Sequence, residues 1–135
     1  MTTPAQRSRQ GGFTLIELMV VISLLVILAT MGLAQYRNSI VVTKEAVLKE
    51  DLFRMRDAID QYYADRGMYP ADLQTLVTDG YMRQVPKDPI TRSVDTWQTI
   101  PAEPDPSNPS VIPGVYDVKS GSEATALDGT RYAEW

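Results

Sequence analysis

The residues that could do chemistry in this 135-residue chain are carboxylates, hydroxyls and glycines, because the sequence holds neither histidine nor cysteine. Histidine is the usual general base near neutral pH and a common metal ligand, and cysteine supplies thiolate ligands and disulfides. Without them, no Ser-His-Asp or Cys-His arrangement can be built. The inventory predicts a protein that is not an enzyme. It leaves two places of interest: a glutamate near the amino terminus and several acids in the tail.

The amino-terminal glutamate is Glu17, which stands at the start of a long apolar run. Residues 18–34 contain no charge and leave no polar face, while Gly11, Gly12 and Phe13 come shortly before Glu17. A carboxylate at the centre of a bilayer costs about 2.5–3.5 kcal/mol on insertion scales. The position of Glu17 therefore calls for a role other than anchoring.

The apolar run is long enough to cross a membrane. As a helix, Phe13–Ala34 would measure roughly 33 Å, against about 30 Å for a hydrocarbon core. Arg7 and Arg9 precede it without acidic neighbours, so we expect the leader to stay in the cytoplasm and the rest to cross. Two simpler interpretations stay open. A plain anchor does not explain Glu17, and a signal peptide cleaved after Gly32-Leu33-Ala34 would have an unusually long apolar region.

Residues 11–29, GGFTLIELMVVISLLVILA, resemble the amino-terminal signature of the type IV pilin superfamily. The resemblance implies that prepilin peptidase cleaves between Gly12 and Phe13, which removes residues 1–12 as a leader. It also implies that the new amino group of Phe13 is N-methylated. In that family the acid at the position of Glu17 is used in filament assembly.

The apolar run is expected to continue as an amphipathic helix. Gly67 stands where a helix should stop, and Pro70 lies just beyond. We expect one helix over Phe13–Arg66, with a membrane and assembly half in 13–34 and an amphipathic half in 35–66. Its apolar stripe has 4, 3, 4, 3 spacing and consists of Leu48, Leu52, Met55, Ile59 and Tyr62.

The surroundings of this stripe allow two interpretations. It could pair with another helix as a coiled coil, or it could be covered by the chain's own head. The second is expected, because the following segments would otherwise have no core. Two i,i+4 charge pairs, Glu45 with Lys49 and Glu50 with Arg54, should each stabilise the helix by about 0.2–0.5 kcal/mol.

Residues 67–135 are predicted to form a small globular head, which makes the chain α+β. We expect one short helix, a rigid proline corner, a proline-rich loop and a small antiparallel sheet, a meander of three strands. The corresponding segments are Leu73–Val77 for the helix, Val85–Pro89 for the corner, Pro101–Pro113 for the loop, and Trp97–Ile100 and Gly114–Lys119 for two of the strands.

The order of motifs in the head resembles that of the major pseudopilin of type II secretion. The motifs are Tyr69-Pro70, the Leu-rich short helix, Val85–Pro89, the run Tyr116–Gly121 and Trp135. That family carries a calcium site in its tail. The resemblance therefore implies calcium ligands here, with a solvated turn as the alternative and no other cofactor expected. The candidate ligands are Asp117, Ser120, Glu123 and Asp128.

The resemblance implies a structural function. The cleaved subunit would polymerise through its amino-terminal helix into a periplasmic pseudopilus that helps export folded proteins across the outer membrane. Its expected partners are its own copies, prepilin peptidase, minor pseudopilins, an inner-membrane platform with its motor ATPase, and the lipid bilayer of the bacterial inner membrane.

The alternative is a type IV pilus or competence pilin, which would serve adhesion, motility or DNA uptake. Major type IV pilins frequently close a loop with a disulfide, so the lack of cysteine favours the pseudopilin. The chain has 17 acidic against 13 basic residues, so no nucleic-acid partner is expected.

Overall fold

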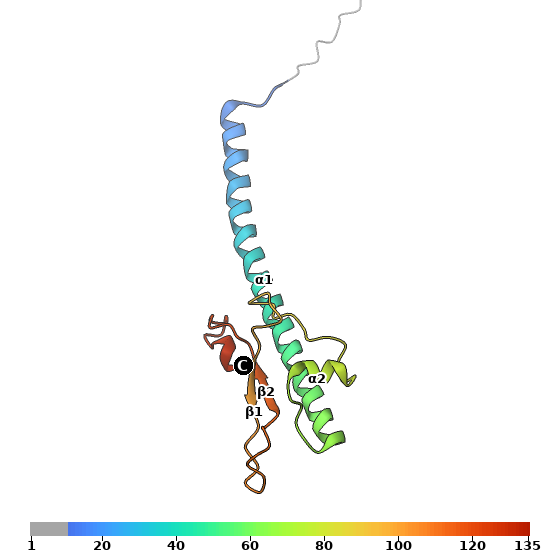
Figure 1. Cartoon of the computed structure of the whole chain (residues 1–135). Coiled ribbons are helices and arrows are strands. Elements are labelled where there is room, and N and C mark those ends of the chain that lie inside the picture. Colours follow the sequence, from blue (N-terminus) through green and yellow to red (C-terminus); the bar gives the residue numbers. More distant parts are fainter. Residues whose placement is uncertain (1–10) are drawn as a thin grey trace, which may run out of the picture. The chain divides into compact units, whose positions relative to one another are not determined.

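The structure is a computed structural model that describes residues 11–135, so most of the expected leader, residues 1–10, lies outside the described residues. Five elements follow one another along the chain (Figure 1). This α+β arrangement of a long helix, a short helix and a small antiparallel sheet confirms the expected fold class. The elements are α1 (Leu15–Arg66), α2 (Leu73–Thr78), β1 (Gln98–Pro101), β2 (Val115–Lys119) and the 3-10 helix η1 (Tyr132–Glu134).

The chain divides into two units between Asn38 and Ser39, and α1 contributes to both. In the first unit, α1 begins at Leu15 and not at Phe13 as expected. Thr14 causes the later start, because its side-chain oxygen accepts a hydrogen bond from Glu17 N at 3.2 Å. A residue that caps a helix in this way lies just outside it. Among the described residues, α1 has the length and apolar composition needed to cross a membrane.

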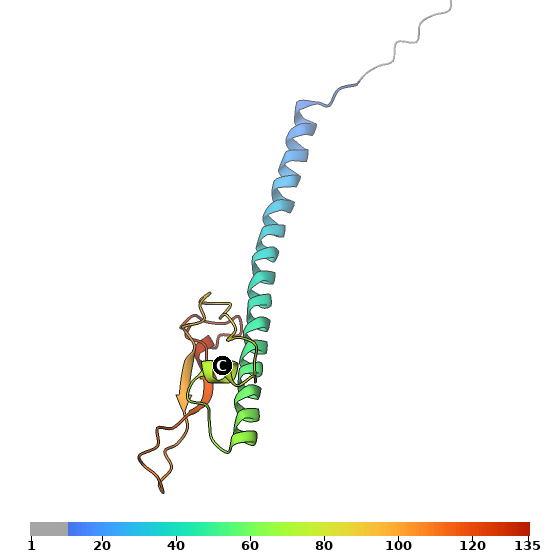
Figure 2. The same ribbon diagram turned by 45° about the vertical axis from the view of Figure 1, so that its right-hand side comes forward.

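In the second unit, the apolar stripe of α1 is buried against the chain's own head. Leu48, Met55 and Ile59 are fully buried, and they share one core with Leu76 of α2 and Val118 of β2. Both views show α2 and the two strands lying along this part of α1 (Figures 1 and 2). The interpretation of the stripe as a site for the chain's own head is therefore confirmed.

The short helix α2 begins and ends at local signals. Asp72 caps its start: Oδ1 accepts hydrogen bonds from Thr75 N at 2.7 Å and from Thr75 Oγ1 at 2.8 Å. Thr78 is its last residue, and Gly80 follows with a φ of 83°, a left-handed conformation that favours glycine. α2 thus lies within a residue of the expected Leu73–Val77 and presents Leu73 and Leu76 to the core.

The sheet has two antiparallel strands in the described residues, not the three that were expected. Gln98 lies opposite Lys119, and Ile100 lies opposite Asp117. After β2, the described residues make an isolated bridge between Thr125 and Arg131 and no third strand. The tail reverses direction within these few residues, so no strand of normal length can form there.

Candidate functional site

The expected processing site is open on all sides. Gly11 and Gly12 have no regular secondary structure, and Phe13 is 85% exposed. Among residues 11–135, and apart from its two chain neighbours, no atom lies within 4 Å of a Cβ added at Gly12. The peptide bond between Gly12 and Phe13 therefore lies in an accessible segment directly before the first turn of α1.

Glu17 lies in that first turn. Its backbone N–H is held by Thr14, while its carboxylate makes no ion pair with any residue between 11 and 135. An acid in the first turn of a helix gains about 0.3–1 kcal/mol from the helix dipole. This is less than the cost of about 2.5–3.5 kcal/mol for a carboxylate at the centre of a bilayer. The helix end alone thus offsets only part of such a cost.

Thr14 is a residue that sequence reasoning passed over. The spacing Thr14-x-x-Glu17 matches the capping box, in which a threonine caps the helix and an acid stands three residues later. That signal was present in the sequence. Its consequence is that the start of α1 is defined by Thr14, which stays in the chain if the leader is cut off before Phe13.

The helix behind Glu17 presents an apolar surface on every side. Within the first unit, large apolar side chains from Leu15 to Leu33 are about half exposed or more. An apolar surface this large is covered in a functional protein by lipid or by other chains. Glu17 therefore stands at the end of a segment that has to be covered by lipid or by other helices.

The four candidate calcium ligands of the tail bind different partners. Asp117 Oδ1 accepts from Arg56 Nε at 2.7 Å, and the buried Ser120 Oγ donates to Asp88 Oδ2 at 2.6 Å. Glu123 forms an ion pair with Arg131 at 3.5 Å.

The fourth candidate, Asp128, accepts hydrogen bonds from Thr130 Oγ1 and Thr130 N, and these bonds lower the pKa of its carboxyl group. In the described part of the chain, no group of three acidic side chains that could hold a metal ion comes together. Calcium takes 6–8 oxygen ligands at 2.3–2.6 Å. The residues in this arrangement do not fit such a site.

Two residues that the sequence did not single out organise this region. Asp88 is fully buried; its Oδ1 accepts from Ile90 N at 2.8 Å, and its Oδ2 accepts from Ser120. Arg56 reaches from α1 to β2 and to the end of the tail. No sequence signal could reveal Arg56, because its partners lie 61–79 residues away in the chain.

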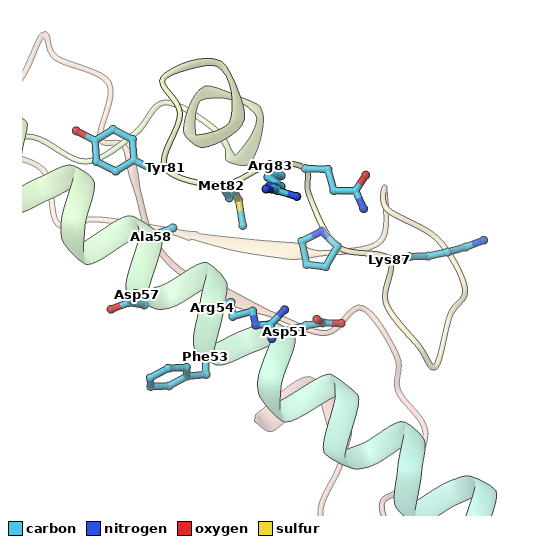
Figure 3. Close-up of a pocket in the computed structure, with 11 residues that line it drawn as sticks. Asp51, Phe53, Arg54, Asp57, Ala58, Tyr81, Met82, Arg83 and Lys87 are labelled. Atoms are coloured by element: carbon cyan, nitrogen blue, oxygen red, sulfur yellow. The ribbon is translucent and has the colours of Figure 1, made fainter.

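A groove of about 620 Å³ separates α1 from the segment after α2 (Figure 3). Asp51 and Arg54 line it from α1, and Arg83 and Lys87 line the opposite side. Burial raises the pKa of Asp51, and the charge of Arg54 partly opposes this shift. Among the described residues that line the groove, no nucleophile is paired with a base.

The amino-terminal pattern, and a longer stretch of about 100 residues, resemble known proteins. The family described as "Prokaryotic N-terminal methylation motif" matches residues 7–33. The type II secretion system core protein G of Pseudomonas aeruginosa is 35% identical over 100 residues, which cover 62% of this chain and 70% of that protein. The protein of the same name from Klebsiella michiganensis is 32% identical with the same coverage.

A shorter match joins the chain to a pilus protein. The fimbrial protein EcpC of Eikenella corrodens is 38% identical over 63 residues, or 47% of this chain and 41% of that protein. No solved structure matches the chain significantly. The longer matches extend well beyond the methylation motif. On this evidence, the chain belongs to the type II secretion system core protein G family, the major pseudopilins of the type IV pilin superfamily.

Proposed function

We propose that this protein is the structural subunit of the pseudopilus of a type II secretion system. The match over 100 residues to core protein G carries this proposal. The mature subunit would begin at Phe13, leave the inner membrane and polymerise through α1 into a periplasmic filament. Prepilin peptidase, minor pseudopilins and the inner-membrane platform with its motor ATPase are the proposed partners, and the protein itself has no catalytic role.

The proposed assembly step uses the amine that cleavage creates. Removal of residues 1–12 leaves a positive amino group on Phe13, four residues before Glu17. Two opposite charges 4 Å apart attract by about 1 kcal/mol in water and by about 4 kcal/mol at an effective dielectric constant of 20. When the Glu17 carboxylate of one subunit meets the Phe13 amine of its neighbour in a poorly hydrated bundle, the pair offsets the cost of burying the acid. A subunit in the wrong axial register would leave Glu17 unpaired.

The test is the variant Glu17→Ala, produced with the rest of the secretion system. We expect normal membrane insertion and a mature terminus at Phe13, but no filament and no secretion. Glu17→Lys should be more defective, because it brings two positive charges together. A matched control is Ser23→Ala in the same apolar segment, where the hydroxyl donates to Met19 O of its own helix at 2.7 Å. Filaments of the alanine variant equal to those of the control would rule out the role of Glu17.

The type IV pilus alternative is supported by the shorter match to the fimbrial protein and by the methylation motif, which fits both functions. Deleting the gene distinguishes the two functions. Loss of secreted enzymes with intact surface pili supports the pseudopilus, whereas loss of surface pili with normal secretion supports the pilus.

A further inference from the structure

The tail of the head is held by the side chain of one arginine. From α1, Arg56 Nε binds Asp117 Oδ1 at 2.7 Å, and Nη2 binds the backbone oxygens of Val118 at 3.0 Å and Trp135 at 2.7 Å. The side chains of Arg56 and Asp117 are 35% and 27% exposed. One guanidinium thus joins α1 to β2 and to the end of the tail.

Two further side chains of α1 support the same attachment. Glu45 Oε1 accepts hydrogen bonds from Leu127 N at 2.8 Å and from Tyr132 Oη at 2.9 Å. The Lys49 ammonium lies 4.6 Å from the centre of a Trp135 ring. Together with Arg56, these residues contact the tail at Leu127, Tyr132 and Trp135.

The tail needs such attachments because it has little regular structure of its own. After β2 it contains one isolated bridge and the three-residue η1. Ordering the backbone costs about 1–2 kcal/mol per residue, and no long strand ladder offsets this cost here. A calcium ion could fix a segment of this kind by collecting carboxylate and backbone carbonyl oxygens.

Arg56 gathers those same ligand types, one carboxylate and two backbone oxygens, around a positive charge. We propose that Arg56 is a built-in cation that fastens the tail to α1, so that the head reaches its folded state without calcium. This inference concerns the subunit alone and does not rest on its assembly into a filament.

The experiment uses the full-length mature protein in detergent. Hydrogen exchange of the amides of residues 118–135 is measured in calcium and in excess EGTA, together with thermal unfolding. Arg56→Met removes the guanidinium and keeps much of the apolar stem. Arg54→Met is the matched control: it lies two residues away on α1, is exposed, and forms an ion pair with Glu50 at 2.8 Å.

We expect the wild-type protein to exchange equally in calcium and EGTA. Arg56→Met should accelerate exchange in the tail by roughly ten- to a hundredfold, since hydrogen bonds to a charged group are lost and the tail opens locally. The amides of α2 and those of the Arg54→Met control should stay near wild type. Calcium should not restore protection to the Arg56→Met tail.

Either of two results would overturn the proposal: calcium-dependent protection of the wild-type tail, or an Arg56→Met tail as protected as that of the control. If Arg56→Met does not fold, Arg56→Lys decides the question. Lysine keeps the charge but cannot hold the same three acceptors in one planar fork. Partial loosening of the tail supports the proposal, and unchanged protection overturns it.

Discussion

Tyr132 shows how one buried side chain in the tail connects packing with pH. Burial, and next the hydrogen bond to the Glu45 carboxylate, raise the pKa of Tyr132 to about 12 from its ordinary value of 10. Below pH 10 the phenol is protonated in both the folded and the unfolded chain, so its contribution is fully present. Between pH 10 and about 12 the unfolded chain loses this proton and the folded chain keeps it. Stability therefore falls as the pH rises through this window.

We predict that Tyr132→Phe reduces the loss of stability between pH 10 and 12, because phenylalanine has no proton to lose. The measurement is the denaturant midpoint of the wild type and the variant at several pH values. Tyr116→Phe, at an exposed position on β2, is the control. If the denaturant midpoints of the wild type and of Tyr132→Phe change in parallel between pH 10 and 12, the role assigned to Tyr132 is wrong.

At the scale of elements, caps fix where the helices of this chain begin. Asp72 caps α2 through Thr75, and those hydrogen bonds lower the pKa of its carboxyl group. The contribution of Asp72 is therefore present above its ordinary pKa of 3.8 and is lost as the pH falls through the lower value of the folded state.

We predict that Asp72→Ala lowers the free energy of unfolding by about 1 kcal/mol, whereas Asp72→Asn retains most of the cap. Urea unfolding at neutral pH measures both. Asp105→Ala is a suitable control, because Asp105 accepts similar hydrogen bonds from Ser107 in a loop but caps no helix. An Asp72→Ala variant as stable as the Asp105→Ala protein would show that the cap contributes little.

The elements also show what the sequence could predict. Periodicity identified the stripe of α1, and the end of that helix was correctly placed before Gly67, whose φ is 67°. The pair Glu50–Arg54 is present, whereas Glu45, expected to pair with Lys49, binds the tail instead. Such signals arise within one helix, where neighbours in sequence are neighbours in space.

Contacts between segments that are far apart in the chain leave no comparable pattern in the sequence. Ser120 and Asp88 are 32 residues apart, and Arg56 and Trp135 are 79 residues apart. The family resemblance suggested a metal site at the tail acids, while their actual partners depend on how the tail folds back onto α1. This is also why the third strand was predicted wrongly: the turn around Thr125 and Arg131 becomes apparent only in three dimensions.

At the scale of the whole molecule, cleavage would convert a membrane-inserted precursor into a subunit able to assemble. In the uncleaved precursor, the nitrogen of Phe13 is part of the peptide bond to Gly12. Neighbouring precursors therefore offer no Phe13 amine to Glu17. An uncleaved chain should therefore insert but not polymerise, even with Glu17 intact. Processing and pairing would then be two separate requirements for one filament.

The variant Gly12→Val tests this separation. Gly12 has open space around it and lacks a left-handed φ, so valine should leave the fold unchanged. A branched side chain next to the cleaved bond should nevertheless block the close approach of the peptidase to the backbone. We predict intact precursor by mass spectrometry, normal membrane insertion, and no filament or secretion. Gly11→Val, one residue earlier and equally open, is the matched control and should be cleaved before Phe13. Filaments built from uncleaved Gly12→Val subunits would show that the Phe13 amine is not the partner of Glu17.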